Sequence, residues 1–163
     1  MSTVITASIR NILSSSLPSV EASKTAIVEA LAANLAAEGP DQSSAQARTT
    51  AMLLVNMLLE QVVHLVEGRQ PQNVEIYREE HRLHAIDERH YTRFAEALIP
   101  ILRDAAGTSL PASAASSWRN TFGAVVRWMQ QQNPCLPFET IVSNPWRGDP
   151  KRGYGRQPHP PSP

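Results

Sequence analysis

Apolar side chains recur along this chain every three or four residues, the spacing that places them on one face of a helix. Six stretches show this pattern, and residues that favour helix ends separate them. No stretch shows a convincing strand pattern. The sequence therefore predicts an all-α fold of about six helices.

The first two predicted helices are divided by Pro18. Apolar positions run from Val4 to Leu17 and then from Val20 to Leu35. A proline inside a helix removes a hydrogen bond and clashes with the preceding turn, so we expect a break at this position. The second helix is expected to end at Gly39-Pro40.

A third helix is expected to begin after the polar group Asp41 to Ser44, which offers several cap candidates. Its apolar positions continue to Leu65 and cover more than one face, which is typical of a central helix. It should end near Gly68, and Pro71 prevents its continuation.

Three further helices are predicted over residues 73–84, 87–107 and 111–133. Asn73 and Asp87 are expected to cap the first two of these, and Gly107 to end the second. Pro100 should kink that helix or shift its start. Pro111 is well placed in the first turn of the last helix.

The composition changes beyond Pro134, where prolines, glycines and basic residues gather. We therefore divide the chain into a helical domain, residues 1–134, and a tail, residues 135–163, which is expected to be disordered. The basic residues of the tail could contact an acidic partner, but a solvated terminus is the simpler interpretation.

Charge and cysteine content bear on which partners the protein could bind and on where in the cell it would work. The 15 Lys and Arg residues balance the 15 Asp and Glu residues, so no global field favours nucleic acid or an anionic membrane. The single cysteine, Cys135, cannot form an intramolecular disulfide, which fits a reducing cytoplasm. The N-terminus lacks the apolar core of a signal peptide, and the most apolar stretch, Ala51 to Leu59, is too short to span a bilayer.

The histidines are the first candidates for chemistry, because three of them cluster at positions 81, 84 and 90. His81 and His84 are three residues apart and would share one face of a helix. No third ligand at a standard spacing completes a zinc site around them. Spacing alone therefore gives only a weak indication of a metal site.

The wider neighbourhood of His81 is more informative. The run from His81 to Leu98 has Tyr91 ten residues after the histidine, and a leucine-rich stretch and Gly107 follow it. A final helix then carries Trp118 and, four residues later, an aromatic residue. This order resembles the second half of the globin family, most closely the globin domain of bacterial flavohaemoglobins and the single-domain bacterial haemoglobins.

The resemblance implies a globin-like fold that binds haem b, with His81 as the iron ligand. In that family the histidine is oriented by a network that includes the tyrosine, here Tyr91, and a glutamate. The glutamate position falls near Asn133, where this chain has no carboxylate. His84, one turn on, is expected near the haem edge or exposed. A plainer interpretation of Tyr91, and of Trp118, is that they are core aromatic residues.

The first half of the chain matches the family more faintly. Its register implies that Gln46 faces the bound ligand, with Thr50 one turn later. The alternative is that Gln46 is an exposed polar residue of the first helical turn.

Two departures from the family affect the distal side. The distal tyrosine of flavohaemoglobins is absent, because Leu31 or Ala32 stands in its place. The helix-to-helix corner between Leu35 and Gln46 is shortened and lacks the phenylalanine that wedges against haem.

The resemblance thus implies a haem-binding globin that binds oxygen, nitric oxide or a similar diatomic ligand, without nucleic acid or membrane as partner. No reductase module is recognised in the chain, so nitric oxide dioxygenase-like turnover would need an external reductase. A homodimer is an open alternative to a monomer. Two other functions stay open. One is a haem-free globin-fold module for signalling or protein interaction, and the other is a helical bundle of unrelated function. If the ferrous iron proved to be six-coordinate without added ligand, His64 or another internal residue would be the distal ligand, and the assignment of Gln46 would be wrong.

Overall fold

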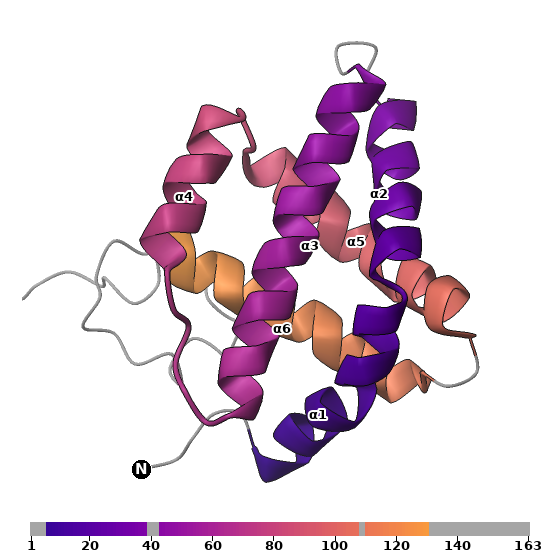
Figure 1. Cartoon of the computed structure of the whole chain (residues 1–163), viewed down its shortest axis with the longest axis vertical. Coiled ribbons are helices and arrows are strands. Elements are labelled where there is room, and N and C mark those ends of the chain that lie inside the picture. Colours follow the sequence, from indigo (N-terminus) through magenta and orange to yellow (C-terminus); the bar gives the residue numbers. More distant parts are fainter. Residues whose placement is uncertain (1–5, 39–42, 108–109, 131–163) are drawn as a thin grey trace, which may run out of the picture.

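The computed structural model describes residues 6–38, 43–107 and 110–130, and all regular structure within these ranges is helical (Figure 1). The helices are α1 (Ala7–Ala22), α2 (Lys24–Glu38), α3 (Ser44–Val66), α4 (Val74–Leu83), α5 (Glu88–Ala106) and α6 (Ala112–Gln130). The prediction of an all-α fold of about six helices is confirmed. The predicted tail, residues 135–163, and the predicted end of the last helix at Asn133-Pro134 lie outside the described residues.

Local capping chemistry sets several of the helix ends, as predicted. The Ser43 hydroxyl accepts a hydrogen bond from the Gln46 amide at 3.2 Å and starts α3. Asp87 starts α5 with a capping box. Its side chain accepts a hydrogen bond from the His90 amide, and the His90 ring accepts one from the Asp87 amide. Gly107 ends α5 with a φ of 63°, in the left-handed region that favours glycine.

One predicted boundary is wrong, and one predicted boundary is right but lacks the expected capping bond. Pro18 lies inside α1, and the break between the first two helices falls at Ser23. Leu13 and Val20, on either side of the proline, are both buried in the core, so packing holds the helix together across the lost hydrogen bond. Asn73 precedes α4 in a left-handed conformation, but its side chain does not cap the helix and instead donates to Glu60 at 3.1 Å.

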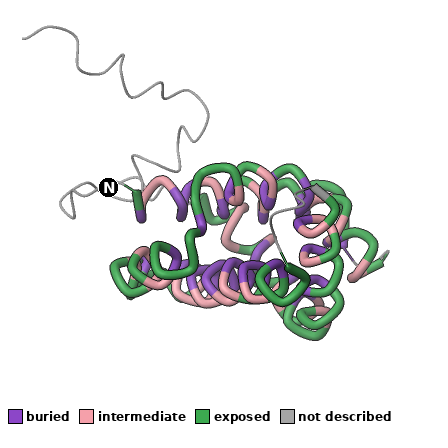
Figure 2. Tube along the Cα trace, turned by 90° about the horizontal axis from the view of Figure 1, so that it is seen from above, coloured by how far each residue is buried: buried purple, intermediate pink, exposed green. Residues whose placement is uncertain are grey.

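Helix α3 packs mainly against α2 and has fewer contacts with α1, α6 and α4, and much of its length is buried (Figure 1). The closest pairs are α2 with α3, α5 with α6, and α2 with α5, whereas α4 packs mainly against α6. Only residues 39–43 separate α2 from α3. Buried residues line the inward sides of the helices (Figure 2).

Aromatic residues of α5 and α6 form the centre of the core. The rings of Phe94 and Phe122 lie with centroids 4.2 Å apart, and both side chains are fully buried. The indole nitrogen of Trp118 donates to the Ser16 hydroxyl of α1 at 2.8 Å, and that hydroxyl in turn donates to the Ile12 carbonyl. Trp118 and Phe122 are therefore core residues, in line with the plainer interpretation of them.

Helix α3 is long and apolar enough to cross a membrane by length and composition alone. Half of its most apolar stretch is buried among the other helices, however. A central helix of a compact bundle has the same composition, so the observation is weak evidence for a membrane span.

Candidate functional site

His81 is the one buried residue of α4, a helix that is otherwise largely polar on its outer side. The side chain is 1% exposed, and it shares the inner face of the helix with Tyr77 and Val74, four and seven residues earlier. A titratable side chain rarely occupies the central position of a packing face unless a partner satisfies it. His81 is therefore the first candidate for function.

The partner of His81 is Tyr91. The Tyr91 hydroxyl and the Nδ1 atom of His81 form a hydrogen bond of 2.8 Å, and the ring centroids lie 5.7 Å apart. Tyr91 stands in the first turn of α5, which the Asp87 capping box fixes in place. The structure thus brings together two residues that the sequence analysis had grouped by their ten-residue spacing.

The second nitrogen of the ring, Nε2, is buried and has no hydrogen-bond partner among the described residues. A buried polar atom without a partner is costly, and such atoms often mark a site of chemistry or of ligand binding. If Nδ1 donates its proton to the Tyr91 oxygen, Nε2 carries the free lone pair of the imidazole. The pair can therefore present a buried nitrogen ligand in a fixed orientation.

The electrostatic setting keeps both partners neutral. Burial, with a smaller contribution from the charge of His84, lowers the pKa of His81 from 6.5 to about 4. Burial also raises the pKa of Tyr91 to about 12, and the Asp87 carboxylate adds to this shift. At neutral pH the ring is thus an uncharged imidazole, the form that binds a metal.

Three side-chain contacts hold α4 in place, and sequence reasoning had missed them. The fully buried amide of Gln61 in α3 donates to the Gln72 carbonyl at 2.7 Å and accepts from the Gln72 amide at 2.8 Å. Arg78 of α4 donates to the Met129 carbonyl of α6 at 3.2 Å, and the contact between Asn73 and Glu60 adds a third link. A glutamine within the apolar stripe of α3 was the only sequence signal for this arrangement.

The two residues predicted on the distal side lie one turn apart on α3. Gln46 is exposed in the first turn, whereas Thr50 is 3% exposed. Figure 1 shows that the start of α3 and the end of α4, where His81 lies, are both at the top of the molecule. Neither residue makes a hydrogen bond with His81 or Tyr91, so the structure joins His81 directly to Tyr91 but does not join Gln46 or Thr50 to them.

His64 is a second histidine with an unusual environment. Both of its ring nitrogens are buried and lack a hydrogen bond, although the Glu60 carboxylate lies 3.7 Å from Nε2. It stands in the last turn of α3, at the opposite end from Gln46. Among the described residues, no three histidine, cysteine or carboxylate side chains gather into a metal-binding group.

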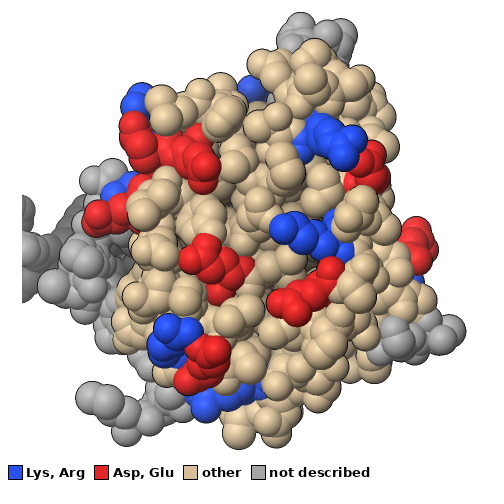
Figure 3. All heavy atoms as spheres, in the orientation of Figure 1, with Lys and Arg blue, Asp and Glu red and all other residues tan. Residues whose placement is uncertain are grey.

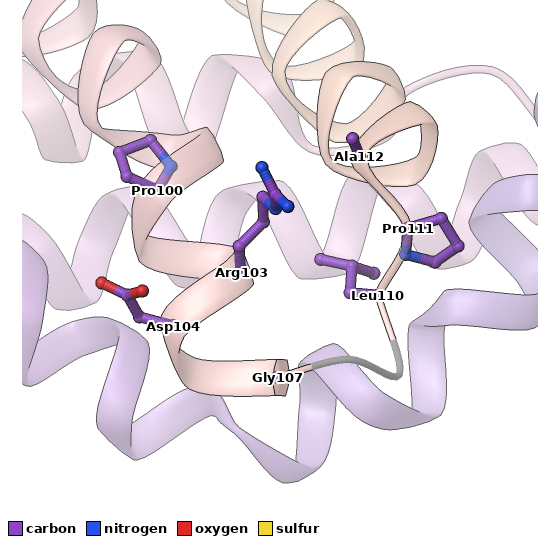
Figure 4. Close-up of a pocket in the computed structure, with 7 residues that line it drawn as sticks. All are labelled: Pro100, Arg103, Asp104, Gly107, Leu110, Pro111 and Ala112. Carbon is purple, nitrogen blue, oxygen red and sulfur yellow. The ribbon is translucent and has the colours of Figure 1, made fainter.

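Two hollows have linings that do not include His81, although one of them is lined by its partner Tyr91. One, of about 270 Å³, runs between α5 and α6 and includes Tyr91, Phe122 and Arg127 in its lining. The other, of about 610 Å³, opens between the end of α5 and the start of α6 (Figure 4). There the Arg103 side chain reaches toward the first turn of α6, whereas Asp104 points the other way (Figure 4).

Acidic and basic side chains are interspersed over the face shown in Figure 3. Several are paired, as Arg48 is with Glu29 at 2.8 Å and Arg82 with Glu79 at 2.6 Å. No large field of one sign covers this face, so long-range attraction of a charged partner has little basis there.

Comparison with protein families, curated proteins and solved structures gives no significant match to any of them.

Proposed function

We propose that this protein is a haem-binding globin in which His81 is the protein ligand of the iron. One observation carries the proposal: a buried neutral imidazole is held at Nδ1 by Tyr91, while its Nε2 has no partner. Metal-bound histidines usually engage their second nitrogen in this way, because that bond fixes the tautomer and the ring orientation. The proposal extends the resemblance of residues 81–122 to the globin family.

The packing of the helices is compatible with this fold. In a globin the haem lies between the helix that bears the proximal histidine and the helix that lines the ligand side, here α4 and α3. These two helices contact each other less than α4 contacts α6 and much less than α3 contacts α2. The framework of α1, α2, α3, α5 and α6 packs closely without depending on the pairing of α3 with α4.

When bound, haem b supplies an iron centre that takes oxygen, nitric oxide or a similar diatomic ligand. The residues of this chain have separate roles around it. His81 provides the nitrogen ligand and Tyr91 orients it. On α3, Gln46 or Thr50 would supply a hydrogen bond to a diatomic ligand if haem is bound.

Among the described residues, no carboxylate is hydrogen-bonded to the Tyr91–His81 pair, and this has a chemical consequence. A neutral phenol is a weaker hydrogen-bond acceptor than a carboxylate, so it draws the Nδ1 proton away from His81 less strongly. His81 therefore stays an imidazole with little imidazolate character. We therefore favour reversible binding of the diatomic ligand over oxygen activation as the function. Any nitric oxide dioxygenase turnover would need electrons from an external reductase.

The test is the absorption spectrum of the protein expressed with a supply of haem. We expect a Soret band that is lost in His81→Ala and restored in part by added imidazole, which can occupy the space left by the ring. His84→Ala is the matched control, because His84 is exposed and only three residues away. A carbon monoxide difference spectrum of the ferrous protein then checks that the sixth position is open. A wild-type protein that stays colourless during haemin titration would refute the proposal.

Two features of the chain favour a second function. The chain by itself already seals the His81 ring from solvent, at 1% exposure, and the α2–α3 corner carries no aromatic residue. Both features suit a haem-free helical module for signalling or protein interaction, in which the His81–Tyr91 pair only specifies the packing of α4. The haemin titration separates the two functions, because only the first binds haem through His81.

A further inference from the structure

The hollow of about 270 Å³ between α5 and α6 has an apolar floor. Four buried residues form this floor: Tyr91, Ala95, Phe122 and Val126. The hydroxyl of Tyr91 is hydrogen-bonded to His81, so Tyr91 offers the hollow mainly its ring. The floor can therefore receive an apolar group, and an aromatic one in particular.

Charged side chains line the rim of the hollow, with acids on one helix and bases on the other. Glu88 and Glu96 belong to α5, whereas Arg119 and Arg127 belong to α6. Only residues 107–111 separate these two helices, so the helices run in opposite directions. Glu88 therefore shares one end of the hollow with Arg127, and Glu96 shares the other end with Arg119. The two ends are about 12 Å apart along each helix.

The helix ends account for the charges at one end of the hollow only. Glu88 lies in the first turn of α5 and Arg127 in the last turn of α6, where the helix dipole stabilises these charges. Glu96 and Arg119 lie in the middle of their helices. Within the described part of the chain, the Glu96 carboxylate has no hydrogen-bond or ion-pair partner. This end of the hollow thus offers an acid and a base to a ligand that carries both charges.

A glycine in the middle of α6 keeps the hollow open. Gly123 lines the hollow one turn after Arg119 and one turn before Arg127. Glycine is, after proline, the least favourable residue inside a helix. The backbone does not require it here, because Gly123 is not among the glycines with a positive φ. A larger side chain at this position would project into the hollow and fill it.

We propose that this hollow is a binding site for a small zwitterion with an apolar body, of the class of a free aromatic amino acid. Arg119 binds the carboxylate, Glu96 binds the ammonium group, and the aromatic body lies on the floor against Tyr91 and Phe122. A ligand with a single charge would leave one of the two opposing charged groups without a partner. Pockets for drug-sized ligands have volumes of roughly 300–1,000 Å³, so this hollow suits a smaller molecule.

The ligand part of the proposal is tested on the full chain without added haem, because His81 does not line the hollow. L-Phenylalanine is titrated while the Gly123 amide is followed by nuclear magnetic resonance. We expect a saturable shift of this amide with a dissociation constant of about 1 mM or lower. Phenethylamine lacks the carboxylate, 3-phenylpropionate lacks the ammonium group and alanine lacks the aromatic body. Each should bind at least about tenfold more weakly.

Variants compared by titration calorimetry test the assigned residues. Arg119→Gln should weaken the binding of L-phenylalanine at least about tenfold and leave that of phenethylamine unchanged, because phenethylamine has no carboxylate. Arg127→Gln is the matched control on the same helix. It should change the affinity less than about twofold, because its charge is more than a Debye length away. Gly123→Leu should abolish binding of both compounds without loss of helical circular dichroism, since leucine favours helix and fills the hollow.

Three outcomes would overturn the proposal. The first is the absence of a saturable shift of the Gly123 amide with L-phenylalanine. The second is equal binding of L-phenylalanine and 3-phenylpropionate, which would leave Glu96 without a role. The third is an equal loss of affinity in Arg119→Gln and Arg127→Gln, which would indicate a general effect of charge.

Discussion

At the scale of single residues, the environment of His81 makes its protonation state depend on folding. The ring is buried and neutral in the folded protein, with a pKa of about 4, and exposed with a pKa of about 6.5 in the unfolded chain. The unfolded state therefore takes up a proton between these values while the folded state does not. The contribution of His81 to stability is complete above pH 6.5 and is lost as the pH falls toward 4.

This difference predicts an acid-sensitive stability in the haem-free protein. Lowering the pH from 7 to 4.5 should remove roughly 2 to 3 kcal/mol of unfolding free energy through His81. Urea unfolding at the two pH values measures the loss. The same experiment on His81→Leu gives the contribution of the remaining groups, and the difference between the two proteins isolates His81. If both lose the same amount, the ring is not held neutral.

The hydroxyl of Tyr91 has a separate, testable contribution. Tyr91→Phe keeps the ring packing but leaves Nδ1 of His81 buried without its partner, so it should cost about 1 to 2 kcal/mol of stability at pH 7. Denaturant titration measures this cost. In a His81→Leu background the same substitution should cost much less, because the two groups are coupled. Equal costs in both backgrounds would mean that the hydrogen bond contributes nothing.

At the scale of helices, hydrogen bonds to α3 and α6 fix the position of α4. Gln61 binds both backbone polar groups of Gln72, and this pairing anchors the connection from α3 to α4. Arg78 anchors the middle of α4 to the end of α6. These contacts could not be predicted from the sequence, because each joins residues whose proximity depends on the fold. The capping roles of Ser43 and Asp87 could be predicted from the sequence, because their hydrogen-bond partners are two or three residues away.

The anchoring by Gln61 predicts a local effect of its removal. Gln61→Leu should destabilise the protein by about 1 to 3 kcal/mol, because it leaves the amide and carbonyl of Gln72 without partners in a half-buried place. Hydrogen exchange should quicken most in the amides of α4. Gln70→Leu is the control, since that side chain is exposed. Uniform acceleration over all six helices would contradict a role specific to α4.

At the scale of the whole molecule, the core of α1, α2, α3, α5 and α6 forms a framework to which α4 is added at one side. Helix α4 has the fewest contacts with the other helices. Haem bound between α3 and α4 would link α4 to the rest of the molecule. A ligand that binds only the folded state raises the apparent stability by mass action.

This linkage predicts that haemin raises the melting temperature of the wild-type protein and not that of His81→Ala. At a free haemin concentration of 100 times the dissociation constant, the gain should be about 2.7 kcal/mol. Thermal unfolding followed by circular dichroism at several haemin concentrations measures it. An equal rise in both proteins would indicate nonspecific binding of the porphyrin to apolar surface.

The sequence by itself determined the all-helical class and most of the helix ends, whereas the pairing of His81 with Tyr91 was expected only from the resemblance to the globin family. Hydrophobic period and capping are local properties, and the ten-residue spacing spans one helix end and one turn. Only the tertiary structure decided that α1 continues through Pro18, because burial of Leu13 and Val20 outweighs the broken hydrogen bond. It alone also revealed the unpartnered Nε2 of His81 and the role of Gln61. Whether a buried polar group finds a partner depends on residues that are distant in the chain.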